Sequence, residues 1–354
     1  MEYLFSNFKP LETANKKFSE VFYSFIPAAT RLDIAVGFIT ADSLAELKQA
    51  IAYNENIEQL NLIIGMHRWE KFTRVEYSTA MELNDYLRKN KRGEVRLVTP
   101  FRFHGKLYTY SKDNKAFAGI IGSNNLSSII DGGVRTYEAA FLFREQLYAQ
   151  QMRNFIDELS QKAADNLADC RIEEFKQKNE LLEGHEYVEK ISRDKLSDYI
   201  SSLTEVSFEI PLTRNGAVPP KSNLNVYFGE GRRSKSTGLI IPRHWYETEL
   251  IVPKEVTSLS GYPQAKTPTA VFDVITDDGW KFKCKVSGDF SKNLRSEGDL
   301  KILGKWIKGR LENNGALEVM KPVTPDTFVK YGRSSLRMTQ TTTPNLWYLD
   351  FGVR

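Results

Sequence analysis

Residues 101–110 read FRFHGKLYTY and place a histidine and a lysine two positions apart. The alternating pattern is typical of a β-strand, in which the side chains of His104 and Lys106 lie on the same face. An imidazole can act as a nucleophile or as an acid and base, and a fixed positive charge beside it suits reactions at phosphate groups. The triplet alone also fits an edge strand whose outward face is polar.

Two further groups could complete such a site. Residues 116–128, AFAGIIGSNNLSS, predict an apolar strand that ends in Gly122-Ser123-Asn124-Asn125, followed by a helix capped by Ser or Asn. Hydroxyl, amide and backbone N–H groups at such a turn can bind an anion, although a tight turn with an N-cap has the same sequence. Glu138 opens the predicted strand 137–143, where its carboxylate could hold a histidine ring in one tautomer. A salt bridge at a strand end is the alternative for Glu138.

The elements expected to position these residues alternate between strand and helix. This order indicates an α/β fold, with a mixed sheet covered by helices. In residues 41–52, the spacing of Leu44, Leu47 and Ile51 predicts a helix with one buried face. The predicted strands are 31–40, 59–66, 95–101, 105–111, 116–123 and 137–143, and the predicted helices are 41–52, 79–90 and 144–161.

Residues 163–198 are polar and helix-prone, and we place the junction between two domains there. We expect one domain at 1–165, a helical or polar linker at 166–198 and a second domain at 199–354. The second domain contains short β-rich runs separated by Gly, Pro, Asp and Ser, as in an all-β barrel or sandwich. Its predicted strands are 206–212, 224–228, 237–242, 249–253, 270–275 and 280–286, and its one clear helix is 300–311.

Positive charge is concentrated in that second domain. The whole chain has a net charge of +4, but residues 280–310 contain nine Lys or Arg residues and three acidic residues. A smaller cluster consists of Arg232, Arg233, Lys235 and Arg243. Local excess of this kind is what a polyanion-binding surface requires. For either cluster taken singly, a solvated surface is the alternative.

Other sequence features narrow the class of protein. The two cysteines lie far apart and form no C-x-x-C pair, which argues against a structural zinc site or a disulfide framework. The first residues do not resemble a secretory signal, and no apolar run reaches the length of a membrane helix. We therefore expect a cytoplasmic protein without a membrane partner. The segment GEGRRSKSTG is not a phosphate-binding P-loop, because the residue directly before Lys235 is serine and not the glycine that the P-loop motif requires. It is either a surface loop or a basic arm that enters nucleic acid.

The groups around His104 together resemble the phospholipase D superfamily, whose signature is H-x-K followed by G-S-x-N. Here the signature is His104-Gly105-Lys106 and Gly122-Ser123-Asn124-Asn125, with Glu138 as the downstream acid. One position departs from the pattern, because the Asp that usually lies five residues after the lysine is Ser111 in this chain. This departure points away from the lipid-cleaving branch and towards the nuclease branch.

The resemblance implies a two-step phosphoryl transfer. His104 would attack phosphorus and form a covalent phosphohistidine, while a second histidine protonates the leaving oxygen and then activates water. Lys106, Ser123 and Asn125 would stabilise charge on the non-bridging oxygens, and Glu138 would orient an imidazole. The scheme requires no cofactor and no divalent metal. Because the chain has one copy of the motif, the second histidine implies a homodimer whose two subunits share one pocket.

The second domain resembles the DNA-binding pseudobarrel of plant transcription factors, in the basic loop after Gly229 and in residues 279–311. In that domain two loops, the first and second arms, grip the major groove. Arg can pair with guanine and Asn with adenine, Asp can accept from cytosine, and lysines contact phosphates. The matching first-arm positions are Arg232, Arg233, Lys235, Ser236 and Thr237. The matching second-arm positions are Lys285, Ser287, Asp289, Ser291, Lys292, Asn293 and Arg295.

A phospholipase D-like nuclease followed by this pseudobarrel resembles the NgoFVII, BfiI-like family of restriction endonucleases. The resemblance implies sequence-specific cleavage of double-stranded DNA. It also implies two potential partners, a separate ATP-dependent helicase-like subunit and a companion methyltransferase. Two other functions stay open, a DNA-binding regulator with an inactive core and a phospholipase. The intact His104, Lys106, Ser123 and Asn125 argue against the first, and the lack of a second motif argues against the other.

Overall fold

The computed structural model describes residues 1–133, 136–178, 180–233 and 238–353. Its residues form two units. The N-terminal unit consists of Met1–Asp131, Thr136–Asn179 and Gly231–Pro242. The C-terminal unit consists of Gly132–Arg135, Glu180–Glu230 and Arg243–Arg354.

The N-terminal unit is built on an eight-stranded sheet with the order β1-β8-β7-β6-β2-β3-β5-β9. Strands β2, β3 and β5 are parallel, and the other neighbouring pairs are antiparallel, so the sheet is mixed, as predicted. The strands are β1 (Glu2–Phe5), β2 (Arg31–Val36), β3 (Gln59–Ile64), β5 (Gly93–Val98), β6 (Lys106–Lys112), β7 (Lys115–Gly122), β8 (Ala139–Phe143) and β9 (Ala164–Asn166).

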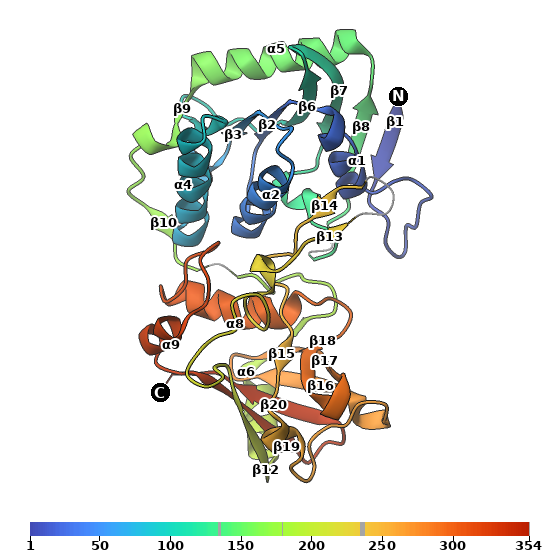
Figure 1. The fold of residues 1–354 in the computed structure, drawn as a ribbon, viewed down its shortest axis with the longest axis vertical. Helices are drawn as coiled ribbons and strands as arrows, with labels where there is room; N and C mark the ends of the chain where they lie inside the picture. Colours follow the sequence, from blue (N-terminus) through green and yellow to red (C-terminus); the bar gives the residue numbers. More distant parts are fainter. Residues whose placement is uncertain (134–135, 179, 234–237, 354) are drawn as a thin grey trace. The chain divides into compact units, whose positions relative to one another are not determined.

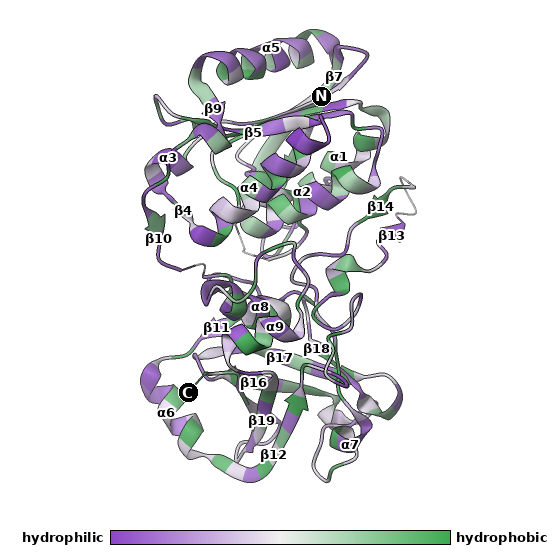
Figure 2. Cartoon of the chain, turned by 60° about the vertical axis from the view of Figure 1, so that its left-hand side comes forward, coloured by the Kyte–Doolittle hydropathy of each residue, from purple (hydrophilic) through white to green (hydrophobic). Residues whose placement is uncertain are grey.

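Helices cover both faces of this sheet (Figure 1). Helix α5 (Gln146–Ala163) lies on one face, and α1 (Phe18–Ser24), α2 (Ala41–Tyr53) and α4 (Arg74–Lys89) lie on the other. In α2 and α4, hydrophobic and hydrophilic residues alternate along the ribbon (Figure 2), and the predicted apolar face Leu44, Leu47 and Ile51 is buried. Each of these two helices starts with a capping box, which satisfies free N–H groups of its first turn.

Shorter elements complete the N-terminal unit: η1 (Ile26–Ala28), α3 (His67–Glu70), β4 (Phe72–Thr73), η2 (Leu126–Ile129), η3 (Leu167–Asp169) and β10 (Phe175–Lys176). The helix predicted after Asn125 is the short 3₁₀ turn η2, and no side chain caps it. The Asn125 side chain is instead used in a contact with another strand end, described below. Helix α4 begins earlier than predicted because Thr73 and Glu76 form its capping box.

The C-terminal unit is mainly β, as predicted, and forms a pseudobarrel. Its main sheet has the order β12-β19-β20-β16-β17-β18-β15, with β11 paired to β17. Along β17, buried Phe282, Cys284 and Val286 alternate with more exposed residues, which is the period of a half-buried strand. The strands are β11 (Glu189–Lys190), β12 (Leu203–Pro211), β15 (Leu250–Ile251), β16 (Val271–Thr276), β17 (Trp280–Ser287), β18 (Asn293–Ser296), β19 (Ser335–Thr341) and β20 (Leu346–Asp350).

Several predictions for this unit were wrong. Residues 224–228 contain the 3₁₀ turn η4 (Val226–Phe228) and not a strand, and the predicted helix α8 (Ile302–Asn313) is accompanied by α9 (Pro325–Tyr331). Strands β19 and β20 were not predicted. The remaining short elements are α6 (Arg193–Ser201), α7 (Lys254–Thr257), η5 (Pro268–Ala270) and η6 (Asp289–Ser291).

The basic run 280–310 is not one continuous surface, because some of its basic side chains are buried. The Lys308 side chain is fully buried, donates to the backbone oxygen of Trp245 at 2.6 Å and lies 3.7 Å from the centre of the Trp245 ring. Arg310 is paired with Asp277. Burial lowers the pKa of Lys308 to about 7, while the charge of Glu312 opposes that shift.

The predicted strand 237–242 is reduced to β14 (Ile240–Ile241), which pairs with β13 (Arg232–Arg233). This hairpin belongs to the N-terminal unit, where Leu239 is part of the main hydrophobic core. Among the described residues, no helix is long and apolar enough to cross a membrane.

Candidate active site

The sheet register brings the predicted catalytic residues to one edge of the N-terminal sheet. Lys106, the first residue of β6, pairs with Val36, the last residue of the parallel strand β2. Further along the sheet, Leu107 pairs with Ile121, and Gly122 pairs with Ala140. The loops that carry His104, Ser123, Asn125 and Glu138 therefore all lie at the carboxyl ends of β2, β3 and β5.

His104 and Lys106 form the centre of this edge. The His104 side chain is exposed, whereas Lys106 is buried with 5% of its surface exposed. The Lys106 Nζ lies 3.1 Å from His104 Nε2 and donates to the backbone oxygen of His104 at 2.6 Å. Burial lowers the pKa of Lys106 from its usual value, and the charge of Glu138 opposes this shift. The pair thus presents a reachable imidazole nitrogen next to a positioned ammonium group.

The loop after β2 holds the His104 ring from the side. The Phe38 ring meets the His104 ring edge-on, with 5.7 Å between ring centres. Gly37 leaves the space that the histidine occupies, because a Cβ atom there would lie 3.1 Å from His104 Cδ2. Any larger residue at position 37 would push against the imidazole.

The turn after β7 places the side-chain amide of Asn125 at the same sheet edge. The Phe38 backbone N–H donates to Asn125 Oδ1 at 3.0 Å, so the Asn125 amide nitrogen keeps its two hydrogens for another acceptor. The neighbouring Asn124 is anchored from below, because the buried Tyr108 hydroxyl donates to its backbone oxygen at 2.8 Å. At Gly122 a Cβ would lie 2.4 Å from the backbone oxygen of Ala139, so only glycine allows β8 to approach this closely.

Ser123 and Glu138 lie together at the other side of the turn. The exposed Ser123 hydroxyl donates to the Glu138 carboxylate, and it accepts from the backbone N–H of Ala139 at 3.0 Å. Ser6, after β1, fixes Glu138 by accepting its backbone N–H at 2.8 Å. Glu138 precedes β8 by one residue, where the sequence predicted that it would open the strand.

Ser111, at the position of the usual superfamily Asp, lies in β6 and is 1% exposed. Its hydroxyl is buried and has no hydrogen-bond partner among the described residues. It lies five positions after Lys106 in β6, and because this offset is odd, its side chain is on the opposite face of the strand. In this fold, position 111 is therefore remote from His104.

The other three histidines are buried. His67 is 3% exposed, His185 is 3% exposed and His244 is 9% exposed. His185 and His244 belong to the C-terminal unit. His67, in α3, lies behind the candidate site, where its ring meets the Phe38 ring edge-on at 5.7 Å. This contact could not be predicted from the sequence, because no motif surrounds His67.

Large apolar side chains are exposed next to the candidate site. Phe101 is three residues before His104, Ile121 is two residues before Ser123, and Tyr137 directly precedes Glu138; their exposed fractions are 47%, 44% and 39%. Exposed aromatic and aliphatic side chains around a polar centre are typical of a surface that another protein covers.

The predicted first-arm residues fall at the β13–β14 hairpin. Arg232 and Arg233 form β13 and are exposed, and Arg233 donates to the backbone oxygen of Gly238 at 3.0 Å. Lys235, Ser236 and Thr237 lie outside the described residues.

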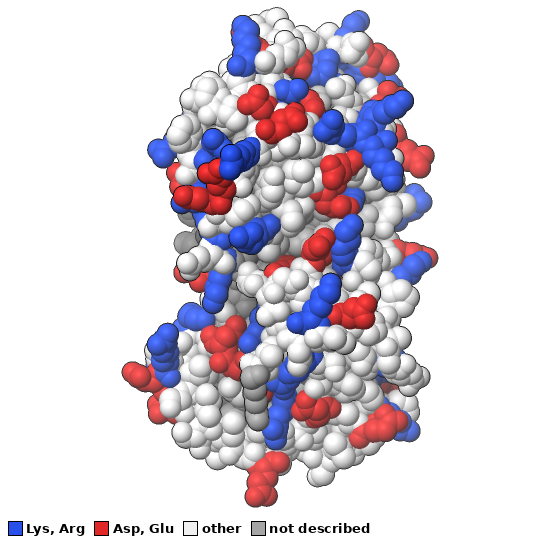
Figure 3. All heavy atoms as spheres, turned by 90° about the vertical axis from the view of Figure 1, so that its left-hand side faces the viewer, with Lys and Arg blue, Asp and Glu red and all other residues white. Residues whose placement is uncertain are grey.

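The predicted second-arm residues fall on β17, β18 and the loop between them, where several have internal partners. Lys285 lies 3.6 Å from Glu297, and Arg295 lies 3.5 Å from Glu249. The Ser291 hydroxyl is buried and links the loop to Gln264 and to the backbone N–H of Ala265. Ser287, Lys292 and Asn293 are partly exposed, and Asp289 is exposed. On the face of the C-terminal unit displayed in Figure 3, Lys and Arg are interspersed with Asp and Glu.

One exposed residue of this loop was missed by the sequence reasoning. Phe290 is 66% exposed and has a φ of 57°, a backbone conformation that bulky residues rarely adopt. The Lys254 ammonium lies 4.6 Å from the centre of its ring. The neighbouring predicted second-arm residues carry side-chain hydrogen-bonding groups, which Phe lacks.

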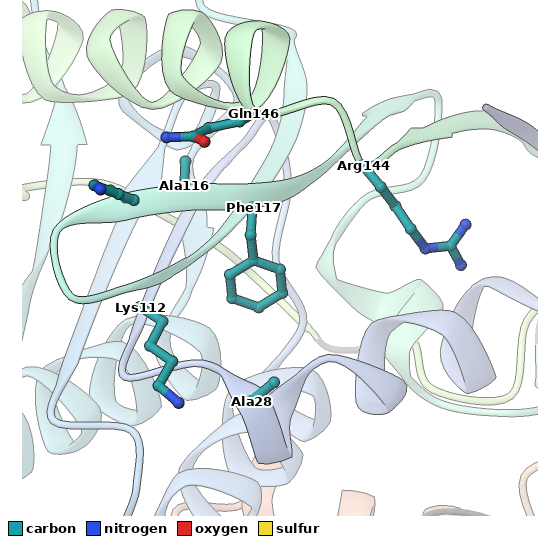
Figure 4. A pocket seen from close by; sticks show the side chains of 7 residues that line it. Ala28, Lys112, Ala116, Phe117, Arg144 and Gln146 are labelled. Carbon is teal, nitrogen blue, oxygen red and sulfur yellow. The ribbon is translucent and has the colours of Figure 1, made fainter.

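A hollow of about 400 Å³ lies elsewhere on the N-terminal unit (Figure 4). Lys112 and Lys115, which line it, flank the turn Asp113–Asn114 at the end of the β6–β7 hairpin away from His104. None of the predicted site residues lines this hollow. Among the described residues, no three His, Cys, Asp or Glu side chains are grouped so that they could hold a metal ion.

Two family models match the chain, one in each domain. The NgoFVII restriction endonuclease N-terminal PLD (phospholipase D) domain matches residues 16–177. The NgoFVII C-terminal B3-like DNA-binding domain matches residues 198–342. Both domains therefore occur in the order that the sequence predicted. No curated protein sequence matches the chain.

Solved structures resemble parts of the chain weakly. NucT from Helicobacter pylori is 14% identical, with a TM-score of 0.29, and the match covers 47% of this chain and 99% of NucT. Phosphatidylserine synthase from Haemophilus influenzae is 13% identical, with a TM-score of 0.32, over 48% of this chain and 41% of the synthase. The archaeal chromatin protein TrmBL2 is 14% identical, with a TM-score of 0.29, over 41% of this chain and 48% of its own length.

Proposed function

Because the chain belongs to the NgoFVII restriction endonuclease family, we propose that it cleaves double-stranded DNA at or near a recognised sequence, through a phosphohistidine intermediate on His104 and without a divalent metal. The observation that carries this proposal is the exposed His104 imidazole, with Nε2 3.1 Å from the buried Lys106 ammonium at the same sheet edge as Asn125. When Lys106 donates to Nε2, the neutral ring carries its proton on Nδ1. Nε2 is therefore unprotonated, and its lone pair becomes free to attack phosphorus when the Lys106 ammonium turns from Nε2 to a non-bridging phosphate oxygen.

In the first step, the bond between His104 Nε2 and phosphorus forms while the bond from phosphorus to the leaving oxygen breaks. A protonated imidazole on the opposite side supplies the proton for that oxygen. The Lys106 ammonium and the free Asn125 amide hydrogens stabilise the charge on the non-bridging oxygens. In the second step, water attacks phosphorus, its proton passes to that same imidazole, and the bond to Nε2 breaks.

The second imidazole is His104 of the partner subunit in a homodimer. All four histidines lie among the described residues, and His104 is the one with an exposed side chain. The buried rings of His67, His185 and His244 cannot reach a DNA phosphate. Phe101, Ile121 and Tyr137 provide an apolar surface around His104 that a second copy would cover.

The chemical step is tested with bis(p-nitrophenyl) phosphate and with plasmid DNA, both in EDTA. Wild-type protein is expected to hydrolyse both, and His104→Ala to hydrolyse neither. An acid-labile, alkali-stable phosphate adduct should form in wild type and disappear in His104→Ala. Activity that survives in His104→Ala, or that requires added Mg²⁺ in the wild type, would contradict the proposal.

The shared site is tested by purifying a heterodimer of one wild-type and one His104→Ala subunit with two different affinity tags. If both imidazoles act on one phosphate, this heterodimer has almost no activity, whereas half of the wild-type activity contradicts a shared site. Ile121→Asp should yield a monomer in sedimentation analysis. The control Val329→Asp, at a C-terminal residue that is 79% exposed, should leave the dimer intact.

We propose that the DNA sequence is recognised by the two arms, the first on the β13–β14 hairpin and the second on β17, β18 and the loop between them, supported by the B3-like match over residues 198–342. A helicase-like ATPase and a methyltransferase are proposed as separate partners, as the family resemblance implies. Isolated protein that cleaves plasmid DNA into discrete fragments without ATP would remove the ATPase from this proposal.

A further inference from the structure

His67 is a buried polar residue that the reaction does not consume. Its Nε2 accepts the backbone N–H of Ile39 at 3.2 Å, and its Nδ1 lies 3.2 Å from the backbone oxygen of Lys71. These two contacts fix one neutral tautomer, with the proton on Nδ1. The ring also stacks on Phe72, with ring centres 4.4 Å apart. Both ring nitrogens are therefore used within the protein.

The segment that His67 holds is the one that contacts the reacting histidine. Residues 37–40 connect β2 to α2, and Ile39 follows Phe38 directly. The Phe38 ring contacts His104, and the Phe38 N–H holds the amide oxygen of Asn125. One short segment thus touches the proposed nucleophile and the proposed amide donor, and His67 supports it from behind.

A second set of backbone bonds ties the loop before His67 to the same place. The Met66 N–H donates to the Gly37 oxygen at 3.0 Å, and the Phe103 N–H donates to the Gly65 oxygen at 3.2 Å. At Gly65 a Cβ would lie 2.0 Å from the Phe103 oxygen, so the two chains are packed without space for a side chain. The ends of β2 and β3 and the start of β6 are therefore linked around His67.

We propose that His67 is a positioning residue, which orients His104 and Asn125 through the segment 37–40. This inference rests on the proposed function, because it concerns the same reaction. The required property is a neutral ring that accepts from Ile39 and donates to Lys71. Burial supports it, since it lowers the pKa of His67 to about 4.

The test compares three substitutions of His67. His67→Phe keeps an aromatic ring against Phe72 but removes both hydrogen bonds. His67→Gln can still accept the Ile39 N–H, and His67→Asn can still donate to Lys71. A displacement near 1 Å can lower a rate by about 100-fold. We therefore expect kcat to fall by about 10- to 100-fold in His67→Phe, with KM for DNA unchanged and partial rescue in His67→Gln.

His244→Phe is the matched control. His244 is also buried, and its Nδ1 also accepts a backbone N–H, that of Tyr246 at 3.0 Å, but it lies in the C-terminal unit. The His244→Phe substitution is expected to lower thermal stability without changing kcat on bis(p-nitrophenyl) phosphate. A fall in kcat that followed stability alone would appear in both variants and would overturn the positioning role.

A double-mutant cycle with Phe38→Ala identifies the route. If His67 acts through Phe38, the double variant is no slower than the slower single variant. Independent, multiplying effects would overturn this route. Wild-type protein that hydrolyses neither substrate would contradict the proposed function, whereas an active wild type with equally active His67→Phe would contradict the positioning role alone.

Discussion

The two units hold their basic side chains in different ways. At the candidate active site, Lys106 is buried beside His104 and, among the described residues, has no carboxylate within ion-pair distance. In the C-terminal sheet, Lys283, Lys285 and Arg295 each lie within 3.7 Å of a carboxylate oxygen. The first arrangement keeps a positive charge available for a phosphate. In the second, each cation must exchange an internal partner for DNA, so its net contribution to affinity is small and its main effect is on specificity.

The largest effect is expected from Lys106→Ala. Loss of one preorganised donor of this kind lowers kcat by about 10²- to 10³-fold, with DNA affinity nearly unchanged because many other phosphate contacts supply the affinity. Single-turnover cleavage and a binding titration measure the two quantities. Lys112→Ala, an exposed lysine at the other end of β6, is the control and should keep full activity. An equal loss in both variants would contradict a specific role of the Lys106 charge in the reaction.

The next largest effect is a pH dependence of the stability of the N-terminal unit. His67 has a pKa of about 4 when folded, below its usual value of 6.5, because of burial. Between pH 6.5 and 4 the unfolded chain binds a proton at this residue that the folded chain does not, so stability falls as the pH falls, by about 3 kcal/mol. Denaturant unfolding of wild type and His67→Phe at several pH values measures the difference. The same slope in both variants would contradict a neutral, buried His67.

Lys308 provides the complementary case in the C-terminal unit. Its folded pKa of about 7 lies below the usual 10.5, so between pH 7 and 10.5 the stability of this unit should rise with pH. Buried His67 and buried Lys308 thus change the stability of the protein in two separate pH ranges.

A smaller effect is expected at the first arm. Arg233 is exposed in β13, and its substitution by Ala should weaken specific DNA binding by about 1–3 kcal/mol if the residue reads a base. Competition between cognate and scrambled duplexes measures this loss. Unchanged discrimination between the two duplexes would remove Arg233 from the base-reading residues.

The smallest effect is expected from Lys285→Ala. Because Lys285 already faces Glu297, its removal should change affinity by less than about 1 kcal/mol and should reduce the salt dependence only slightly. A loss as large as that of Arg233→Ala would show that the ion pair opens on DNA and that the paired cations read the sequence after all.

These differences explain which parts of the molecule could be predicted from the sequence. The predicted strands around His104 coincide with β2, β3, β5, β6, β7 and β8, because long periodic runs and short turns leave few alternatives. The β6–β7 hairpin, which is local in the sequence, then places Lys106, Ser123 and Asn125 at one edge. The first domain follows from the motifs around His104, and the second domain follows from the basic loop after Gly229 and residues 279–311.

The second-arm loop could not be predicted in this way. Its shape depends on Ser291 reaching Gln264, on the left-handed backbone at Phe290 and on ion pairs with residues far along the chain. The same limit applies to Lys308, which has the sequence context of a surface helix but is buried against Trp245. His67 was also missed, because its role depends on the ends of three separate strands meeting.

The turn at Asp113 and Asn114 has a practical consequence for engineering. Both residues are exposed and have positive φ values, as in the two-residue turns that close a hairpin, and they lie at the opposite end of β6 and β7 from His104. An inserted peptide tag, or new chain termini in a circular permutant, should be tolerated there. A split enzyme that reassembles on demand could be divided at this point without separating the histidine from its own strand.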